Sequence, residues 1–268
     1  MDQPVVRLDR MQPGVAVITL DRPEVRNAVN WQSWRELGAA LGEVSADPDC
    51  RALVLTGTGG AFCAGGDVKS SPAHGHGLGA PVARLTLGHQ VLRDLIRVPI
   101  PVLAAVEGPA VGVGWSLALA CDLVVAADDA VFGAPFVLRG LVPDGGAGWF
   151  LTRLIGRHRA ARLLLTGERV PARAAADAGL VTQLASPGEA LPEALELAAT
   201  LARGAPEALR LTKGLVRAAE DLPLDRYLEM EWLSATLDST GPDPVEGRAA
   251  FVEKREPDFS RLRELPPR

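Results

Sequence analysis

Two short glycine-rich stretches could present backbone N–H groups to a ligand. Ala64-Gly65-Gly66-Asp67 lies within residues 57–69, and Gly112-Val113-Gly114 lies downstream; each follows an apolar run and precedes a helix-like segment. Glycine permits positive φ and close approach of the backbone to a ligand, and N–H groups at such turns bind anions and oxyanions. Brought together, the turns could each donate one N–H to a single oxygen. In such an oxyanion hole one donor can be worth about 3 kcal/mol.

The residues around these turns allow other interpretations. Asp67 is a good N-cap for a helix opening at Val68. Gly112 and Gly114, with Ala118 and Asp128, resemble a loose dinucleotide fingerprint, but residues 107–111 separate the strand from the turn, whereas that fingerprint follows its strand directly. Ser116 lacks the second glycine of a nucleophile elbow, and no histidine is placed to activate it. The oxyanion interpretation is therefore preferred.

The bulk properties narrow the class of protein. The chain has 268 residues, is 47% hydrophobic with a mean hydropathy of +0.12, and carries a net charge of −5 with a pI near 5.5, which argues against nucleic acid as a partner. No apolar run reaches the ~18 residues of a membrane span, and the N-terminus has no signal-peptide pattern. We expect a cytoplasmic enzyme with no membrane partner.

The cysteines and histidines give no metal motif. Cys50, Cys63 and Cys121 are odd in number and lack C-x-x-C spacing, which indicates reduced thiols. His74 and His76 lie in a Gly/Ser/Pro-rich segment, residues 70–80, which is either a plain surface loop or a mobile flap beside a ligand. Neither histidine has an acidic neighbour, so we expect no metal.

Hydrophobic periodicity predicts strand–turn–helix units followed by helices. Strands are expected at 5–8, 15–20, 52–56, 102–106, 123–126, 131–133 and 180–184. Helices are expected after Asn30, around residues 85–96, and at 112–120, 146–155, 158–165, 172–178, 188–203, 206–220, 224–238 and 244–254. This order predicts an α/β core over residues 1–190 and a helical region over 191–268.

Six segments, in order, resemble the crotonase family, the enoyl-CoA hydratase/isomerase superfamily. They are ITLDRPEVRNAVN at 18–30, LVLTGTGGAFCAGGDV at 53–68, PVLAAVEGPAVGVG at 101–114, ACDLVVA at 120–126, GLVPDGG at 140–146 and AAFVEKREP at 249–257. The resemblance implies a spiral of ββα units with a C-terminal helical oligomerisation domain, assembled as a trimer or a dimer of trimers. It implies an acyl-CoA substrate, a role in fatty acid metabolism and no separate cofactor.

The resemblance also implies roles for individual residues. The N–H groups of Gly66 and Val113 would hold the thioester carbonyl, although the family usually has glycine at the second position. The residues expected to contact CoA are Arg26, Ala28, Ala64, Asp67, Val68, Phe251 and Lys254, the last two reaching a neighbouring subunit or closing the acyl pocket. Trp115, Phe136 and Trp149 are candidates to line the acyl pocket, with core packing as their alternative role.

The departures from the family pattern bear on the reaction. Hydratases of this family use two glutamates to activate water, and the matching positions here are Ser116 and Phe136. Asp144, in P-D-G-G, matches the catalytic aspartate of some family isomerases, including ring-opening isomerases of phenylacetate catabolism; its alternative role is turn formation. Since acid/base groups contribute ~10²–10⁴-fold each, we expect an isomerase with Asp144 as proton shuttle. A hydratase, a non-catalytic acyl-CoA binding protein, and a thioesterase or decarboxylase remain alternatives.

Overall fold

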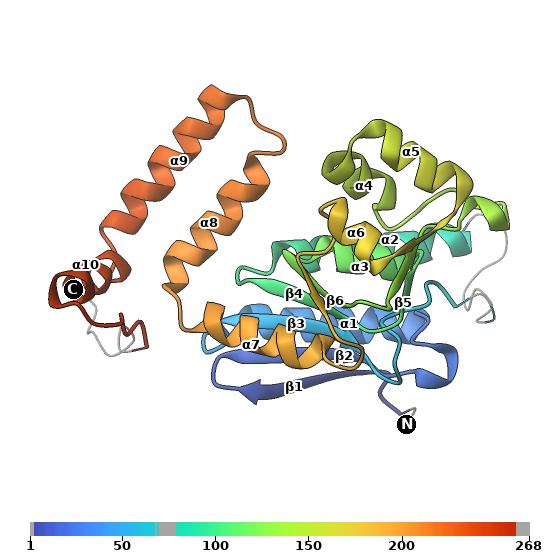
Figure 1. The fold of residues 1–268 in the computed structure, drawn as a ribbon, viewed down its shortest axis with the longest axis horizontal. Helices are drawn as coiled ribbons and strands as arrows, with labels where there is room; N and C mark the ends of the chain where they lie inside the picture. The colour runs from blue at the N-terminus through green and yellow to red at the C-terminus, as the bar shows by residue number, and fades with distance from the viewer. Residues whose placement is uncertain (1–2, 68, 70–78, 261–268) are drawn as a thin grey trace.

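The main sheet contains the strands that lead into the two glycine-rich turns. The computed structural model describes residues 3–67, 69 and 79–260 (Figure 1). The sheet has six strands in the order β1-β2-β3-β4-β6-β9, antiparallel between β1 and β2 and parallel elsewhere. The strands are β1 (Val6–Gln12), β2 (Val15–Leu20), β3 (Ala52–Gly57), β4 (Val102–Val106), β6 (Leu123–Ala127) and β9 (Gln183–Ala185). β2, β3 and β4 are buried along nearly their whole length, as continuous apolar runs in parallel sheets usually are.

A second, smaller sheet lies beside the first. It joins β5 (Pro109–Val111), β7 (Val131–Gly133) and β8 (Arg169–Pro171), with β5 parallel and β8 antiparallel to β7. β5 and β8 were not predicted, because each spans three residues and begins or ends at proline. The strand predicted at 180–184 overlaps β9, which begins three residues later and ends one residue later.

Helices cover both sheets. α1 (Trp31–Ala46) begins at Asn30, whose side chain accepts from the Ser33 N–H at 2.9 Å, so this predicted cap is confirmed. α2 (Gly79–Arg97) packs against α1, and every residue of α3 (Val113–Ala120) is buried. The remaining helices of this part are the short η1 (Pro23–Val25) and η2 (Val137–Arg139), then α4 (Ala147–Ile155), α5 (Arg157–Thr166) and α6 (Ala172–Asp177).

The boundary between the two parts of the molecule falls later than residue 190. α7 (Ala190–Ala202) lies along the main sheet, with three fully buried alanines, Ala190, Ala194 and Ala198, facing its strands (Figure 1). The composition shift near residue 190 marks only the end of the strands. α7 therefore belongs to the core, and the extension begins after it.

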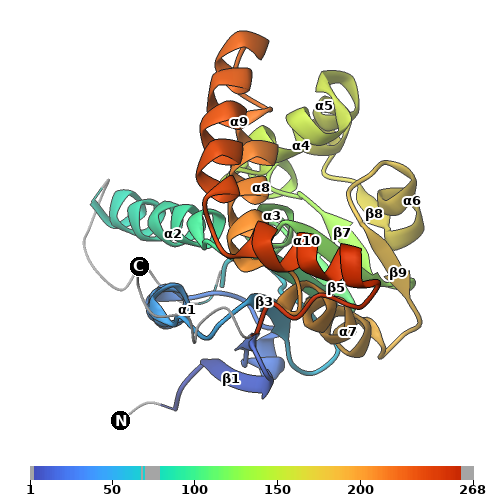
Figure 2. The same ribbon diagram turned by 90° about the vertical axis from the view of Figure 1, so that its left-hand side faces the viewer.

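Three helices form an extension that projects from the core. α8 (Pro206–Ala218), α9 (Leu224–Ser239) and α10 (Asp243–Glu253) stand away from both sheets in Figure 1, and Figure 2 views the molecule from the side on which they lie. Lys213 ties α8 to the core by donating to the Ile100 carbonyl at 2.7 Å and pairing with Asp122 at 2.6 Å. α8 and α9 pack on each other, yet neither helix contains a buried residue. Among the described residues, no helix is both long and apolar enough to cross a bilayer.

Candidate functional site

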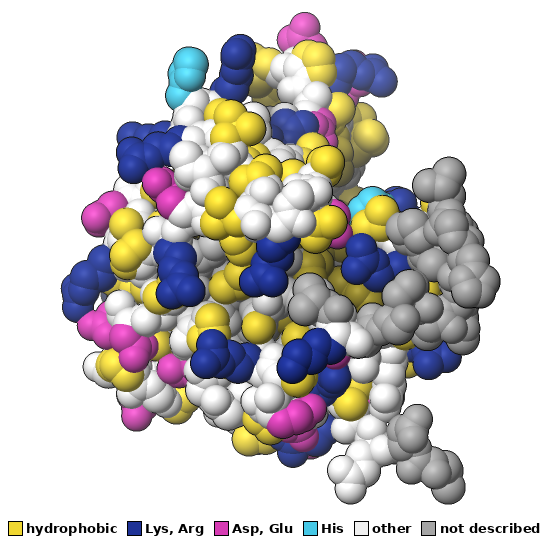
Figure 3. Space-filling model, turned by 90° about the vertical axis from the view of Figure 1, so that its right-hand side faces the viewer, with side chains coloured by type: hydrophobic (Ala, Val, Ile, Leu, Met, Phe, Trp, Pro, Cys, Tyr) yellow, Lys and Arg dark blue, Asp and Glu magenta, His cyan; other side chains and the backbone are white. Residues whose placement is uncertain are grey.

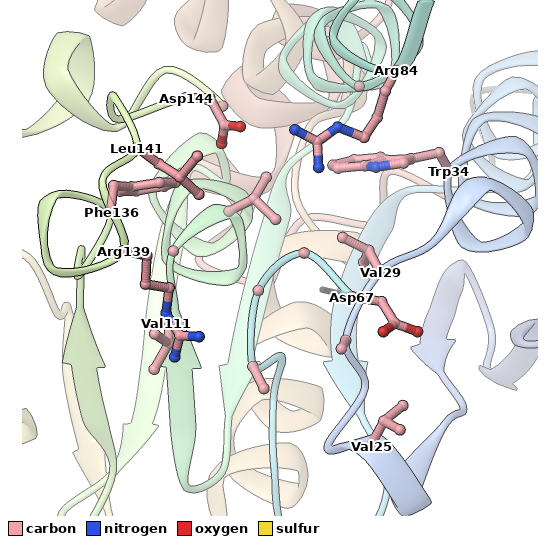
Figure 4. A pocket seen from close by; sticks show the side chains of 18 of the residues that line it. Val25, Val29, Trp34, Asp67, Arg84, Val111, Phe136, Arg139, Leu141 and Asp144 are labelled. Atoms are coloured by element: carbon pink, nitrogen blue, oxygen red, sulfur yellow. The ribbon is translucent and has the colours of Figure 1, made fainter. Parts of the chain in front are cut away.

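A cavity of about 430 Å³ lies where the loops after β2, β3 and β5 meet α2 and the segment before α4 (Figure 4). Figure 4 shows Asp144, Phe136 and Leu141 on one side and Trp34 and Asp67 on the other. The described residues that line it are Glu24, Val25, Arg26, Ala28, Val29, Trp34, Ala64, Gly65, Gly66, Asp67, Lys69, Arg84, Leu85, Gly88, His89, Leu92, Val111, Gly112, Val113, Pro135, Phe136, Arg139, Leu141, Asp144 and Gly145.

The two glycine turns are brought together by backbone pairing. Cys63 donates its N–H to the Pro109 carbonyl at 3.0 Å, and Val111 donates to the Cys63 carbonyl at 2.9 Å. Gly114 allows α3 to start directly against this pair, since a Cβ there would lie 2.3 Å from the Cys63 oxygen. The predicted juxtaposition of the turns is thus present in the fold.

Gly66 and Val113 present N–H groups at the cavity. Val113 is the first residue of α3, where an N–H has no partner within the helix. Val29 donates to Gly65 at 2.8 Å and accepts from Asp67 at 2.9 Å, so the intervening Gly66 N–H points away from Val29. In the described part of the chain neither N–H donates a hydrogen bond, so both are available to a ligand oxygen.

A buried ion pair fixes the first turn. Arg22 donates to the Asp67 carboxylate at 3.0 Å and to the Ala28 carbonyl at 2.6 Å, and the two charged side chains are only 15% and 9% exposed. Asn27 reinforces this contact by donating to the Thr58 and Ala61 carbonyls at 2.8 and 2.7 Å. The loop after β2 and the loop after β3 are therefore held together at this side of the cavity.

Asp67 corrects one prediction. The residue does not cap a helix that opens at Val68 and continues through Lys69, since Lys69 lies in a bend. Its carboxylate instead accepts from the Lys69 N–H at 3.0 Å and pairs with Arg22. An aspartate that caps a helix and an aspartate that accepts from the N–H two residues later occur in the same sequence pattern. The sequence therefore could not distinguish the two roles.

The predicted CoA-contacting residues divide into two groups. Arg26, Ala28, Ala64 and Asp67 line the cavity, with Glu24 and Lys69 beside them. Figure 3 shows Lys and Arg side chains spread over the face that it draws, among apolar and some acidic ones. Val68, like His74 and His76, lies outside the described residues.

Phe251 and Lys254 lie far from this chain's own cavity. Phe251 is on α10, is 85% exposed and does not line the cavity, and Lys254 ends that helix with φ +54°. The extension that carries them projects from the core, so neither residue is part of this cavity (Figure 1). Closure of this chain's own acyl pocket by them does not occur in this structure.

Asp144 is half-buried and lies on the same side of the cavity as Phe136 and Leu141 (Figure 4). Its backbone carbonyl accepts from the Ala147 N–H at 3.3 Å, so the residue does form the predicted turn, while its side chain faces the cavity (Figure 4). Burial raises the pKa of this carboxyl, and the positive charges of Arg84 and His89 partly oppose that rise. A half-buried carboxyl with a raised pKa suits proton abstraction.

The two positions matching the family's glutamates hold no acid. Ser116 is fully buried, and its hydroxyl donates weakly to the Asp144 and Gly112 carbonyls, at 3.4 and 3.5 Å. Phe136 lines the cavity as predicted. Of the acids among the described lining residues, Asp67 is paired with Arg22 and Glu24 lies close to Arg22 as well, which leaves Asp144 beside Phe136 and Leu141.

The two tryptophans proposed for the acyl pocket lie elsewhere. Trp115 is 1% exposed and packs toward Phe132 of the second sheet, with ring centroids 5.8 Å apart, because α3 is buried on every side. Trp149 is on the outer face of α4, stacked under the Arg153 guanidinium at 4.4 Å. Neither lines the cavity, so Trp115 is a core residue and Trp149 a surface one.

The helix after residues 70–80 was expected from the sequence to shape the acyl pocket, but the residues with which it does so were not identified. α2 contributes Arg84, Leu85, Gly88, His89 and Leu92, a spacing of one helical face. The apolar members of this face were identified as a helix signal, but nothing in the sequence indicated which face meets the ligand. Trp34, Arg139 and Leu141 were missed in the same way.

The chain matches a known protein family and is similar in sequence to named members of it. The family model described as enoyl-CoA hydratase/isomerase matches residues 10–262. A protein of Rhodobacter capsulatus named as a probable enoyl-CoA hydratase is 41% identical over 247 residues, covering 92% of this chain and 95% of the relative. The 1,2-epoxyphenylacetyl-CoA isomerase of Escherichia coli is 37% identical over 257 residues, with 94% and 97% covered.

A solved structure agrees with the sequence relatives. The crystal structure of an enoyl-CoA hydratase from Polaromonas sp. JS666 superposes with a TM-score of 0.90 at 38% identity, covering 94% of this chain and 98% of that one. The similarity extends over the core and the helical extension alike.

Proposed function

The chain belongs to the enoyl-CoA hydratase/isomerase family and has the crotonase fold, and on that premise we propose that it is an acyl-CoA isomerase. The proposal is that it moves a double bond, or rearranges an unsaturated or epoxidised ring, in a CoA thioester. The observation that carries it is the acyl end of the cavity, where Asp144 is the carboxylate available among the described residues while Ser116 and Phe136 replace the glutamates that activate water.

In the proposed mechanism one carboxyl group moves the proton. The Asp144 carboxylate removes a proton from C2 of a 3-enoyl thioester, and the electron pair of that C–H bond moves into the thioester carbonyl. The N–H groups of Gly66 and Val113 stabilise the resulting dienolate oxygen. The carboxyl then returns the proton to C4, the carbonyl reforms, and the double bond lies between C2 and C3. No water is consumed.

The surroundings of Asp144 support a shuttle that excludes water. Phe136 and Leu141 lie on its side of the cavity (Figure 4). An apolar wall keeps water from the dienolate, and it also contributes to the burial that raises the pKa of the carboxyl. The same group can therefore both accept and return a proton.

The first test replaces the shuttle. Asp144→Asn keeps the shape of the side chain but cannot ionise, so 3-enoyl to 2-enoyl conversion should fall by roughly 10²–10⁴-fold while the Kd for CoA thioesters is unchanged. Asp129→Asn, a surface acid outside the cavity, is the matched control and should keep full activity. Activity that survives Asp144→Asn would reduce this residue to its turn-forming role.

A hydratase is the second candidate, because relatives such as the one from Rhodobacter capsulatus carry that name. A panel of 2-enoyl-, 3-enoyl-, dienoyl- and ring-epoxide CoA thioesters separates the two by mass, since isomerisation leaves the mass unchanged and hydration adds one water. A robust rate of water addition to crotonyl-CoA would refute the isomerase. Release of free CoA or carbon dioxide would indicate a thioesterase or decarboxylase, and binding without turnover would indicate a binding protein.

A further inference from the structure

α2 brings a positively charged group into the acyl end of the cavity. Its lining face combines the apolar Leu85 and Leu92 with Arg84 and His89. Figure 4 shows the Arg84 side chain extending past Trp34 toward the side on which Asp144 lies. A guanidinium in this position carries five N–H donors in a rigid fork.

Arg84 has no protein partner in the described part of the chain. It forms no hydrogen bond there, and no acidic oxygen lies within the 4.0 Å of an ion pair. Asp144 is close enough that the charge on Arg84 lowers the pKa of its carboxyl, with a smaller contribution from His89. The N–H donors of Arg84 therefore face the cavity and can bind a ligand placed there.

The charges at the acyl end do not cancel. Among the described lining residues that act on Asp144, two basic side chains, Arg84 and His89, face this single acid. A plain hydrocarbon chain would desolvate these donors without replacing their hydrogen bonds to water, which costs binding free energy.

We propose that Arg84 is a specificity-determining residue that selects acyl groups bearing an acceptor oxygen along the chain or at its end. A carboxylate fits the local positive charge and the bidentate geometry of a guanidinium; a hydroxyl or ring oxygen uses the same donors with less charge. This inference rests on the proposed function only in taking a CoA thioester as the ligand. It does not depend on which reaction follows.

Calorimetry with unreactive ligands tests the inference without turnover. Succinyl-, glutaryl- and adipoyl-CoA are compared with butyryl-, pentanoyl- and hexanoyl-CoA of equal chain length, and with the corresponding ω-hydroxyacyl-CoA series. At the chain length that reaches Arg84, the carboxylate should bind about 10- to 100-fold tighter than the hydrocarbon, because charge-assisted hydrogen bonds have that strength. The hydroxyl series should lie between the two if a neutral oxygen suffices.

Variants of α2 assign the effect to the residue. Arg84→Leu should abolish the preference by weakening carboxylate binding and tightening the binding of hydrocarbon thioesters, since no donors are then desolvated, and it should leave the Kd for free CoA unchanged. Arg84→Lys should restore part of the preference. Arg93→Leu, on the same helix but outside the cavity lining, is the control and should change nothing.

Three results would overturn the inference. One is equal binding of both series at every chain length, which leaves the proposed function intact. Another is a preference that persists in Arg84→Leu. The third is a loss of affinity for free CoA itself in that variant, which would place Arg84 on the CoA phosphates. If no CoA thioester binds at all, the proposed function falls with it.

Discussion

At the scale of single residues, the environment of Asp144 links catalysis to pH and to stability. Burial raises the pKa of its carboxyl above the ordinary aspartate value of about 3.9, while Arg84 and His89 pull it down. A base must be ionised to act, so the fraction of active enzyme increases as pH rises through this pKa. The contribution of this carboxyl to the stability of the fold changes in the opposite direction, because it decreases as pH rises through the same pKa.

We predict an acid limb in the pH profile of isomerisation. The value of kcat/KM should rise with pH and reach half its maximum above the ordinary pKa of aspartate, because the folded chain raises the pKa of Asp144. In Arg84→Leu the half-maximum should move to still higher pH, since a charge that lowers the pKa is gone. A limb that does not move in this variant would mean that another group controls the profile.

The stability of the fold should respond in the other direction. A carboxyl whose folded pKa exceeds its unfolded pKa stabilises the fold below the unfolded pKa, and this contribution is lost as pH rises through the folded pKa. At neutral pH the folded chain therefore carries the cost of an ionised, half-buried side chain. The Asp144→Asn variant should consequently melt at a higher temperature than the parent chain at neutral pH, even as activity is lost.

The sequence predicted the positions of residues that belong to a recognisable motif. It did not predict the positions of residues whose surroundings depend on how helices pack. Gly66, Val113 and Asp144 lie in segments whose order is diagnostic, and all three line the cavity. Trp115 follows the second turn directly, yet the burial of α3 on all sides turns it into the core. Arg84 sits in an ordinary amphipathic helix, and only the contact between α2 and the cavity distinguishes it from a solvated arginine.

At the scale of elements, the start of α3 is placed by the lack of a side chain at Gly114. The helix can approach the loop after β3 only because no Cβ meets the Cys63 oxygen. The hydrogen bonds that join Cys63 to β5 run through the same contact. The spacing between the two N–H donors therefore depends on this one position.

We predict that Gly114→Ala separates the two turns. The added Cβ would lie 2.3 Å from the Cys63 oxygen, and such overpacking typically costs about 1–3 kcal/mol of the free energy of unfolding. Because one oxyanion donor is misplaced, kcat should fall on the order of 10²-fold. Urea unfolding and steady-state kinetics measure the two effects.

Gly42→Ala is the matched control for that substitution. Gly42 is an exposed glycine of α1, and a Cβ there would meet nothing within 4 Å. Alanine in an exposed helix position is better than glycine by about 1 kcal/mol, so this variant should be slightly more stable and fully active. Full activity in Gly114→Ala as well would mean that α3 does not set the donor spacing.

Hydrophobic periodicity predicted most of the helices and longer strands. It did not predict the three-residue strands or the boundary between the core and the extension. The apolar runs of β2, β3 and β4 and the capped α1 stand close to where the sequence predicts them. β5 and β8 pair through three residues each, which is too few for a period-two pattern to be visible. α7 has the composition of the extension but presents buried alanines to the sheet, so composition alone put the boundary too early.

At the scale of the whole molecule, the extension leaves a large apolar surface exposed. α9 and α10 expose Leu224, Leu228, Trp232, Leu233, Leu237, Val245, Phe251 and Val252. A soluble monomer rarely exposes so many contiguous apolar side chains on one element pair. We propose that this surface packs on further copies of the chain, in the trimer or paired trimer expected from the family resemblance.

Trp232→Asp should weaken that assembly. Trp232 is 67% exposed on α9, and truncating a central aromatic anchor typically costs about 2 kcal/mol or more of association free energy. Sedimentation velocity across a dilution series should show a trimeric or larger parent chain and a variant that dissociates at concentrations where the parent remains assembled.

Met11→Asp serves as the comparison for the assembly. Met11 is a similarly exposed apolar residue, but it lies on β1 rather than on the extension (Figure 1). The sedimentation coefficient of this variant should match that of the parent. A parent chain that is monomeric at every concentration would refute the assembly, and with it any role for Phe251 and Lys254 at a neighbouring CoA.

The burial of Ser116 means that a single substitution cannot place a glutamate at position 116 without rearranging its surroundings. Gly145 packs so closely on it that a Cβ on that glycine would lie 3.1 Å from the serine hydroxyl. A glutamate at 116 would need the volume that the segment carrying Asp144 now fills, and its charge would enter a site with no solvent. A glutamate at this position would therefore require that segment to be rebuilt at the same time. Installing such a group by design needs coupled changes at position 116 and in the segment that carries Asp144.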